Sequence, residues 1–202
     1  MKKKLFVALL LLVVITAFYF NYERLLNIFN SSNSRNTEDV DINKLHIINQ
    51  RYYSLLASLN FSGMLFPSKK IYDLNNNQLI PVPLKGMNIV IILSNAGCNP
   101  CQIRELKNID SLYQKKKQIL NVTVIYDGSD KEEELYLKKL SQVQFKFYYT
   151  KGYTFNEFNF TKRYPIVFFI RDNIILSSLI AIPDDDIFSS YFYKTVIKKI
   201  TP

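Results

Sequence analysis

The two cysteines of this chain, Cys98 and Cys101, are the residues whose types and spacing could do redox chemistry. They follow an apolar, β-branched run at 88–93 and precede a charged, helix-like pattern from Gln102. Cysteines three positions apart in the first turn of a helix share one face, close enough to form a disulfide. The helix N-terminus favours a thiolate, because it carries free N–H groups and a partial positive charge. The pair therefore predicts a dithiol that alternates between reduced and oxidised states.

The alternative is a permanent disulfide clip. Closing so short a loop removes little entropy from the unfolded chain, so a purely structural bond has little to gain. The spacing therefore favours a redox-active pair over an inert one.

Strand-like and helix-like patterns alternate around the pair. The predicted elements are a helix at 40–59, a hairpin at 71–79, strands at 88–93, 120–126 and 145–149, helices at 102–118, 129–143 and 187–200, and a hairpin of 166–170 with 174–180. Such alternation predicts a three-layer α/β domain with a central mixed sheet. Its active edge should lie where strand ends meet helix N-termini, which is where Cys98 falls.

The N-terminus predicts a membrane segment. Residues 1–4 are basic and 5–20 are apolar, so 1–22 is expected to be a transmembrane signal anchor. Residues 23–40 then form a polar tether, and 41–202 form the domain, with an N-terminal helix and hairpin extension. Cleavage as a signal peptide stays open. Either way the domain lies on the extracytoplasmic, periplasmic side of the inner membrane, away from cytosolic reductants.

Composition excludes other classes. With 48% hydrophobic residues the chain can build a core, and its net charge of +9 comes with no basic block interleaved with aromatics, so no nucleic-acid partner is expected. His46 is the only histidine, and a surface or packing role is expected for it, with no metal site. An aromatic run is either core under a loop or a partner groove. Its members are Tyr148, Tyr149, Tyr153, Phe155, Phe158 and Phe160.

Several pieces of the chain together resemble the thioredoxin superfamily, most closely the membrane-tethered thiol:disulfide oxidoreductases of the TlpA/ResA type. They are the strand ending at Ser94, the motif Cys98-Asn99-Pro100-Cys101, residues 121–127, and residues 160–170 around Pro165. The resemblance covers about residues 61–200. It implies a thioredoxin-like three-layer sandwich preceded by the single transmembrane helix.

The resemblance implies that Cys98 is the nucleophile and Cys101 the resolving thiol. The physical argument agrees, because the more N-terminal sulfur is nearer solvent and the free N–H groups. Asn99 and Pro100 would tune the pair.

The resemblance also implies a cis Tyr164–Pro165 bond beside the cysteines, where Tyr164 and Pro165 bind extended substrate chain. The residues alone leave open that Pro165 only begins an edge strand.

Two positions depart from the family pattern. Gly97 replaces the aromatic residue usual before the first cysteine, which opens the surface around Cys98. Arg104 stands where a glutamate assists proton transfer in the TlpA/ResA type, and Glu105 follows it. Glu105 is therefore a candidate proton acceptor for Cys101, and the alternative is a solvated surface glutamate.

The expected function is extracytoplasmic thiol-disulfide exchange on exported proteins that carry disulfides or thiols, as a reductase or relay served by a membrane or periplasmic redox partner. No diffusible cofactor is expected beyond the redox-active disulfide. The alternative is a thioredoxin-fold binding or assembly subunit of an envelope or export complex, with a dispensable cysteine pair. The sequence leaves the direction of exchange and the oligomeric state open.

Overall fold

The computed structural model describes residues 42–128, 131–152, 154–158 and 163–200. The chain divides into two compact units, Met1–Leu45 and His46–Pro202, and all the described strands lie in the second. The predicted membrane segment 1–22 and tether 23–40 lie outside the described residues. Among the residues that are described, no helix is both long and apolar enough to cross a bilayer.

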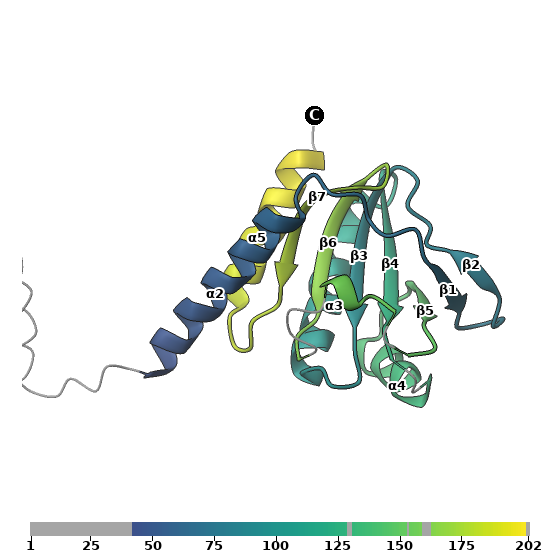
Figure 1. Cartoon of the computed structure of the whole chain (residues 1–202), viewed down its shortest axis with the longest axis horizontal. Coiled ribbons are helices and arrows are strands. Elements are labelled where there is room, and N and C mark those ends of the chain that lie inside the picture. The colour runs from purple at the N-terminus through teal and green to yellow at the C-terminus, as the bar shows by residue number, and fades with distance from the viewer. Residues whose placement is uncertain (1–41, 129–130, 153, 159–162, 201–202) are drawn as a thin grey trace, which may run out of the picture. The chain divides into compact units, whose positions relative to one another are not determined.

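The order of elements follows the sequence pattern closely (Figure 1). They are α2 (Ile42–Phe61), β1 (Lys70–Asp73), β2 (Leu79–Pro81), β3 (Met87–Leu93), α3 (Asn99–Lys116), β4 (Leu120–Tyr126), α4 (Lys131–Ser141), β5 (Lys146–Tyr149), the 3₁₀ turn η1 (Asn156–Phe158), β6 (Ile166–Arg171), β7 (Ile174–Ile180) and α5 (Asp186–Ile200). Each predicted helix, strand and hairpin is confirmed.

The strands form one seven-stranded mixed sheet in the order β2-β1-β5-β4-β3-β6-β7. Strands β3, β4 and β5 are parallel, because α3 and α4 carry the chain back between them. Strand β6 runs antiparallel to β3 and pairs with β7 through a tight hairpin. Its tip residues, Asp172 and Asn173, both have positive φ angles, as a two-residue hairpin loop requires. The mixed central sheet is therefore confirmed.

Each face of the sheet carries its own core, which gives the three layers. Ile89 and Ile91 of β3 pack with apolar residues of α3, α4 and α5. The alternate residues Val90 and Ile92 pack on the other face with Ala57 of α2, and with the segment that includes η1. A strand covered on both faces needs a continuous apolar run, which is what β3 has.

The aromatic run belongs mainly to this core. Tyr148, Tyr149, Phe155 and Phe158 are buried. This confirms the prediction of core under a loop for these four, whereas Tyr153 and Phe160 lie outside the described residues.

Helix α2 covers the edge strand β7. The Ser54 hydroxyl donates to the Ile180 carbonyl at 3.1 Å and accepts from the Ile180 N–H at 3.0 Å. One turn later, Ser58 accepts from the Ser178 N–H at 3.2 Å. These two serines satisfy backbone groups of an edge strand that would otherwise be open to other strands.

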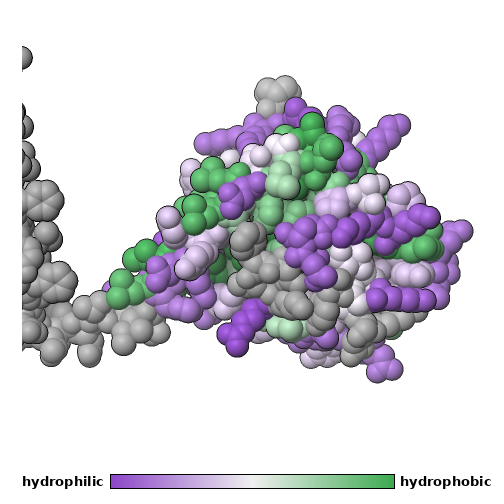
Figure 2. All heavy atoms as spheres, viewed as in Figure 1, coloured by the Kyte–Doolittle hydropathy of each residue, from purple (hydrophilic) through white to green (hydrophobic). Residues whose placement is uncertain are grey.

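The apolar stripe of α2 faces away from the domain. Small residues, Ser54, Ala57 and Ser58, let the helix approach the sheet, so the larger side chains remain exposed. Figure 2 shows apolar side chains along this helix. Its exposed members are Ile48, Tyr52, Leu55 and Leu59. Tyr53 and Leu56 are exposed as well, but they line a pocket.

Candidate active site

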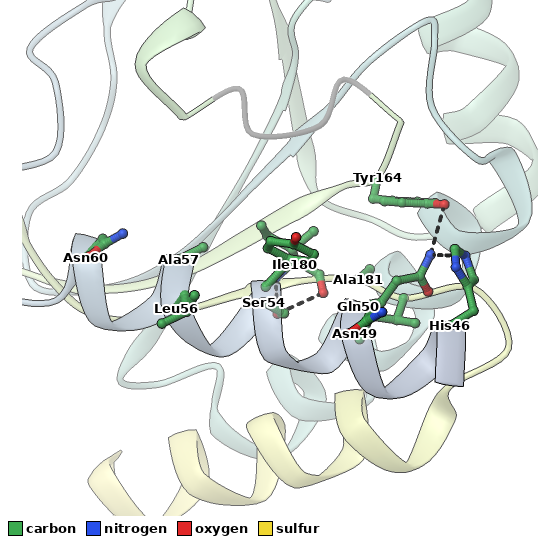
Figure 3. A pocket seen from close by; sticks show the side chains of 12 residues that line it. His46, Asn49, Gln50, Ser54, Leu56, Ala57, Asn60, Tyr164, Ile180 and Ala181 are labelled. Carbon is green, nitrogen blue, oxygen red and sulfur yellow. Dashed lines mark hydrogen bonds between the residues drawn. The ribbon is translucent and has the colours of Figure 1, made fainter. Parts of the chain in front are cut away.

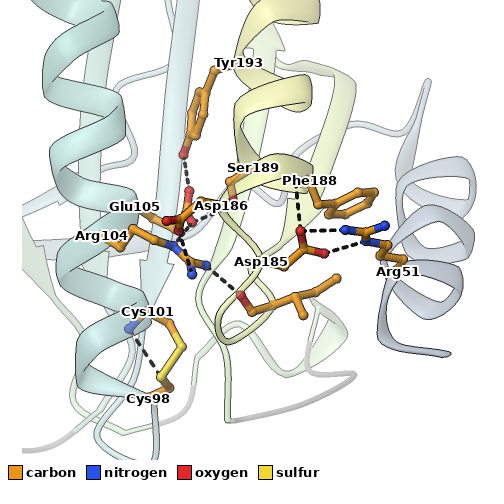
Figure 4. Close-up of polar contacts among 11 residues, drawn as sticks. Arg51, Cys98, Cys101, Arg104, Glu105, Asp185, Asp186, Phe188, Ser189 and Tyr193 are labelled. Carbon is orange, nitrogen blue, oxygen red and sulfur yellow. Dashed lines mark hydrogen bonds and ion pairs between the residues drawn. A yellow bond between two sulfur atoms is a disulfide. The ribbon is translucent and has the colours of Figure 1, made fainter. Parts of the chain in front are cut away.

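The cysteine pair lies at the N-terminus of α3, just beyond the end of β3, and is joined in a disulfide with its Cα atoms 5.2 Å apart (Figure 4). Cys98 is the N-cap residue and is half-buried, whereas Cys101 is only 2% exposed. An incoming thiol or disulfide can therefore reach Cys98 and not Cys101. The predicted placement of both cysteines at a strand-to-helix corner is confirmed.

The first turn of α3 directs backbone N–H groups at Cys98. The Cys101 N–H donates to Cys98 Sγ at 3.2 Å, and the Gln102 N–H donates to the Cys98 carbonyl at 2.9 Å. Pro100 sits in this turn, where its missing N–H has no intrahelical partner to lose. In the reduced protein the Cys101 N–H and the positive end of the helix would stabilise a Cys98 thiolate.

A buried glutamine holds the loop that enters the helix. Gln102 is fully buried, and its side-chain carbonyl accepts from the Ser94 N–H at 3.0 Å. Its amide nitrogen donates to Asn99 Oδ1 at 3.0 Å. Gln102 could not be recognised as a site residue from the sequence, because a glutamine in a charged helical pattern carries no sign of burial.

The packing of Gln102 also explains why position 97 is a glycine. A Cβ on Gly97 would lie 2.7 Å from Gln102 Nε2 and 2.8 Å from the Ser94 carbonyl oxygen. No side chain fits there unless the loop moves, so the glycine follows from the way Gln102 packs.

The proline loop lies against the cysteine loop. The Cys98 N–H donates to the Arg163 carbonyl at 2.7 Å, and the Ala181 N–H donates to the Pro165 carbonyl at 3.0 Å. Pro165 is buried and Tyr164 half-buried. The structure thus brings together the two predicted motifs, Cys98–Cys101 and Tyr164–Pro165, which lie far apart in the sequence.

Two expectations about Pro165 are wrong. No cis peptide bond occurs among the described residues, so Tyr164–Pro165 is trans. The trans form is intrinsically preferred before proline by about 0.5–1 kcal/mol, and in this form the loop makes both hydrogen bonds. Nor does Pro165 begin an edge strand, because β6 lies between β3 and β7.

Glu105 is fully buried, and so is not a solvated surface residue. Ser189 Oγ and Arg104 Nε donate to its Oε1 at 2.8 and 3.0 Å, and the Tyr193 hydroxyl donates to its Oε2 at 2.8 Å. Figure 4 shows the carboxylate turned toward Ser189 and Tyr193, which come from α5, and one turn along α3 from Cys101. Glu105 therefore joins α3 to α5, and its role as proton acceptor stays a prediction.

Burial and the charge of Glu105 both affect the pKa of Tyr193. Burial raises the pKa of the Tyr193 phenol well above its ordinary value, and the neighbouring Glu105 carboxylate adds to this.

Arg104 also donates to the Ile182 carbonyl at 2.7 Å and lies 3.2 Å from Asp186. Arg104 thus holds the start of α5.

A second ion pair anchors α2 to the same end of α5. Arg51 donates two parallel hydrogen bonds to Asp185, at 2.5 and 2.8 Å, and the Phe188 N–H donates to Asp185 Oδ1 at 3.1 Å. The hydrogen bond from Arg51 is the main reason that the pKa of Asp185 is lowered, and the same bond raises the pKa of Arg51. Asp185 therefore caps α5 and positions α2.

A pocket of about 630 Å³ opens between α2 and the proline loop (Figure 3). Tyr164 forms one wall, and its hydroxyl accepts from Gln50 Nε2 at 3.3 Å. The same amide nitrogen lies 2.8 Å from His46 Nε2. His46 is exposed, as expected, but the fold brings it to the rim of a pocket beside the site, which its sequence distance from the cysteines did not indicate.

Among the described residues, no group of three or more histidine, cysteine or acidic side chains is arranged to hold a metal ion. Both cysteines, the strongest metal ligands available, are engaged in the disulfide.

Comparison with known proteins shows similarity at the level of fold. No family model matches the sequence, and no protein of curated function is significantly similar to it. Among solved structures, the chain is similar to the thioredoxin domain of a thiol-disulfide oxidoreductase from Bacteroides vulgatus, with a TM-score of 0.56 and 14% identity over 69% of this chain and 98% of that one.

Two further structures are similar. A thiol:disulfide interchange protein from a Bacteroides species has a TM-score of 0.53 and 12% identity over 70% of this chain and 91% of that one. A thiol-disulfide oxidoreductase from Bacteroides fragilis has a TM-score of 0.50 and 14% identity over 66% of this chain and 99% of that one. The chain therefore has a thioredoxin-like fold, with a Cys-Asn-Pro-Cys disulfide at the N-terminus of α3.

Proposed function

We propose that this protein is a thiol:disulfide oxidoreductase of the protein-disulfide reductase type. One observation carries the proposal: a disulfide whose half-buried sulfur caps a helix N-terminus and whose partner sulfur is buried. A purely structural bond gains nothing from such asymmetry, whereas exchange requires one reachable sulfur and one protected sulfur.

The reaction proceeds in two balanced exchanges. In the reduced protein, the Cys98 thiolate attacks one sulfur of a substrate disulfide, which forms a mixed disulfide and releases the other substrate sulfur as a thiolate. Cys101, deprotonated, then attacks Cys98 Sγ and releases the second substrate thiolate. The substrate gains two electrons, and the protein ends with the Cys98–Cys101 bond that the structure holds.

The remaining site residues have supporting roles in this proposal. Tyr164 and Pro165 line the place where the substrate chain lies beside Cys98, since the loop that carries them is hydrogen-bonded to the Cys98 N–H. Asn99 and Pro100 tune the pair from within the first turn. Glu105, four residues after Cys101, is the candidate acceptor of its proton.

We further propose that the domain works outside the inner membrane, tethered by residues 1–22, on exported proteins that carry disulfides or thiols. The basic and apolar pattern of the N-terminus supports this placement. A dithiol outside the cytosol needs a membrane or periplasmic partner to return it to the reduced state, because cytosolic reductants do not reach it.

Trapping tests the proposal. Cys101→Ser leaves Cys98 able to attack and removes the thiol that resolves the product, so mixed disulfides with envelope proteins should accumulate after alkylation. The matched control, Cys98→Ser, retains the buried cysteine and should trap none. If Cys101→Ser traps nothing and Cys98→Ser has the parent phenotype, the chain is instead a binding or assembly subunit.

The reduction potential of the Cys98–Cys101 pair tests the direction. Equilibration with glutathione should give a reductase a reduction potential near −270 mV, roughly that of thioredoxin, whereas a strong oxidant has a potential of roughly −120 mV. A measured value at the oxidising end would overturn the reductase assignment and leave the exchange chemistry intact.

A further inference from the structure

The pocket beside the proline loop has a composition that selects a particular kind of substrate segment. We propose that it receives a bulky, uncharged apolar side chain from the polypeptide whose cysteine exchanges with Cys98. This inference rests on the proposed oxidoreductase function and adds the substrate preference of that site.

The pocket adjoins the proline loop, which is hydrogen-bonded to Cys98. Tyr164 forms part of its wall and stands between Arg163, whose carbonyl binds the Cys98 N–H, and Pro165, whose carbonyl binds the Ala181 N–H. Ala181 lines the pocket as well. A polypeptide joined to Cys98 through a disulfide therefore has its neighbouring residues next to the mouth of this pocket.

The lining favours an apolar occupant. Its buried lining residues include Ala57 from α2 and Ile180, Ala181 and Ile182 from the end of β7 and the following loop. No lysine, arginine, aspartate or glutamate of the described chain lines it. Burying a charged group in such surroundings is costly, whereas an apolar side chain gains from leaving water.

The lining also contains polar side chains that are joined to one another. Gln50 bridges His46 and Tyr164 there, as Figure 3 shows. A pocket of about 630 Å³ with an apolar interior and a few polar groups at its edge is typical of a binding site. It is large enough for a phenylalanine or leucine side chain with part of the backbone that carries it.

Helix α2 offers matched residues inside and outside the pocket. Tyr53 and Leu56 line it, with exposed fractions of 67% and 38%. Their sequence neighbours Tyr52 and Leu55 are 58% and 53% exposed and do not line it. Replacing either pair by serine removes the same kinds of side chain from the same helix, so only the pocket distinguishes the two double variants.

The experiment uses the full chain, reduced and freed of reductant, and two disulfide-cyclised peptides that carry phenylalanine or serine beside the reacting cysteine. Glutathione disulfide serves as a substrate with no side chain for the pocket. In each reaction the Cys98 and Cys101 thiols become a disulfide and the substrate disulfide becomes two thiols. Acid quenching and mass spectrometry give the second-order rate constants.

The parent should reduce the phenylalanine peptide about tenfold or more faster than the serine peptide, the factor expected for burying one apolar side chain. Tyr52→Ser/Leu55→Ser should retain this ratio, and Tyr53→Ser/Leu56→Ser should bring it to within about threefold. All three proteins should reduce glutathione disulfide at the same rate.

Three results would overturn the inference. The first is a parent that reduces the phenylalanine and serine peptides at rates within twofold of each other, and the second is an equal loss of this rate ratio in both double variants. The third is a rate ratio that falls as the protein concentration rises, which would place a second copy of the chain in the pocket. Failure of the proposed function looks different, because no substrate, glutathione disulfide included, would then be reduced.

Discussion

The buried carboxylate of Glu105 offers a quantitative test of how α5 is held against the active-site helix. Glu105→Gln keeps the size and shape of the side chain and removes its charge. In the parent three donors, from Arg104, Ser189 and Tyr193, converge on the two carboxylate oxygens at 2.8 to 3.0 Å. The variant replaces one of these oxygens by an amide nitrogen, so one hydroxyl must reverse its role.

The magnitude follows from the difference between charged and neutral hydrogen bonds. A hydrogen bond to a charged group contributes about 1.5–3 kcal/mol and a neutral one about 0.5–1.5, so three weakened bonds suggest about 3 kcal/mol. Arg104 lessens the loss, since it is 20% exposed and keeps its contacts with the Ile182 carbonyl and Asp186. We expect Glu105→Gln to lower the free energy of unfolding by about 2–3 kcal/mol.

Urea unfolding of the oxidised full chain, followed by far-ultraviolet circular dichroism, measures this change; the chain has no tryptophan to report it. Asp110→Asn is the matched control, a carboxylate-to-amide change on the same helix, where the Asp110 carboxylate accepts an exposed hydrogen bond from Gln114. The control should stay within about 0.5 kcal/mol of the parent. A Glu105→Gln protein equally close to the parent would refute the reasoning that the buried network holds α5.

The remaining predictions concern charge and packing. Arg51→Met should lower the free energy of unfolding by about 1–3 kcal/mol at neutral pH, because it leaves buried Asp185 without its ion-pair partner. Since the pKa of Asp185 is lowered in the folded state, this contribution is present above about pH 4 and is lost as the pH falls through the folded-state pKa. Parent and variant should therefore converge in acid unfolding curves. Gly97→Ala should lower the free energy of unfolding by about 1–3 kcal/mol and slow glutathione disulfide reduction, since the added Cβ would displace Gln102. A rate and an unfolding midpoint like those of the parent would contradict the packing argument. Tyr193→Phe should reduce the loss of stability above about pH 10, because a raised phenol pKa means that the unfolded state loses its proton first; unchanged alkaline unfolding curves would contradict this.

The order of elements was predictable because local patterns determine it. The β-branched run at 88–93 became β3, and the positive-φ residues Asp172 and Asn173 closed the expected hairpin. The least accurate boundary was the start of α3, which begins three residues before Gln102 because Cys98 caps the helix. Element type depends on neighbours in sequence, and these can be read directly.

The direction of the apolar stripe of α2 was not predictable. Spacing alone predicts a helix with one apolar side, and such a side usually faces the core. Here Ser54 and Ser58 bind the backbone of β7, more than 100 residues further along the chain, and this turns the larger apolar side chains outward. Hydrogen bonds between distant segments leave no periodic signal in either segment.

The cysteine pair shows where sequence ends and tertiary structure begins. By itself the sequence determined that Cys98 and Cys101 open a helix after a buried strand, because residue type, spacing and flanking pattern are local properties. Only the folded chain decided that Gln102 is buried beneath Gly97, that Glu105 faces α5, and that α2 forms a pocket at the proline loop. These features depend on which distant surfaces pack together, and that is settled by the burial of the whole core.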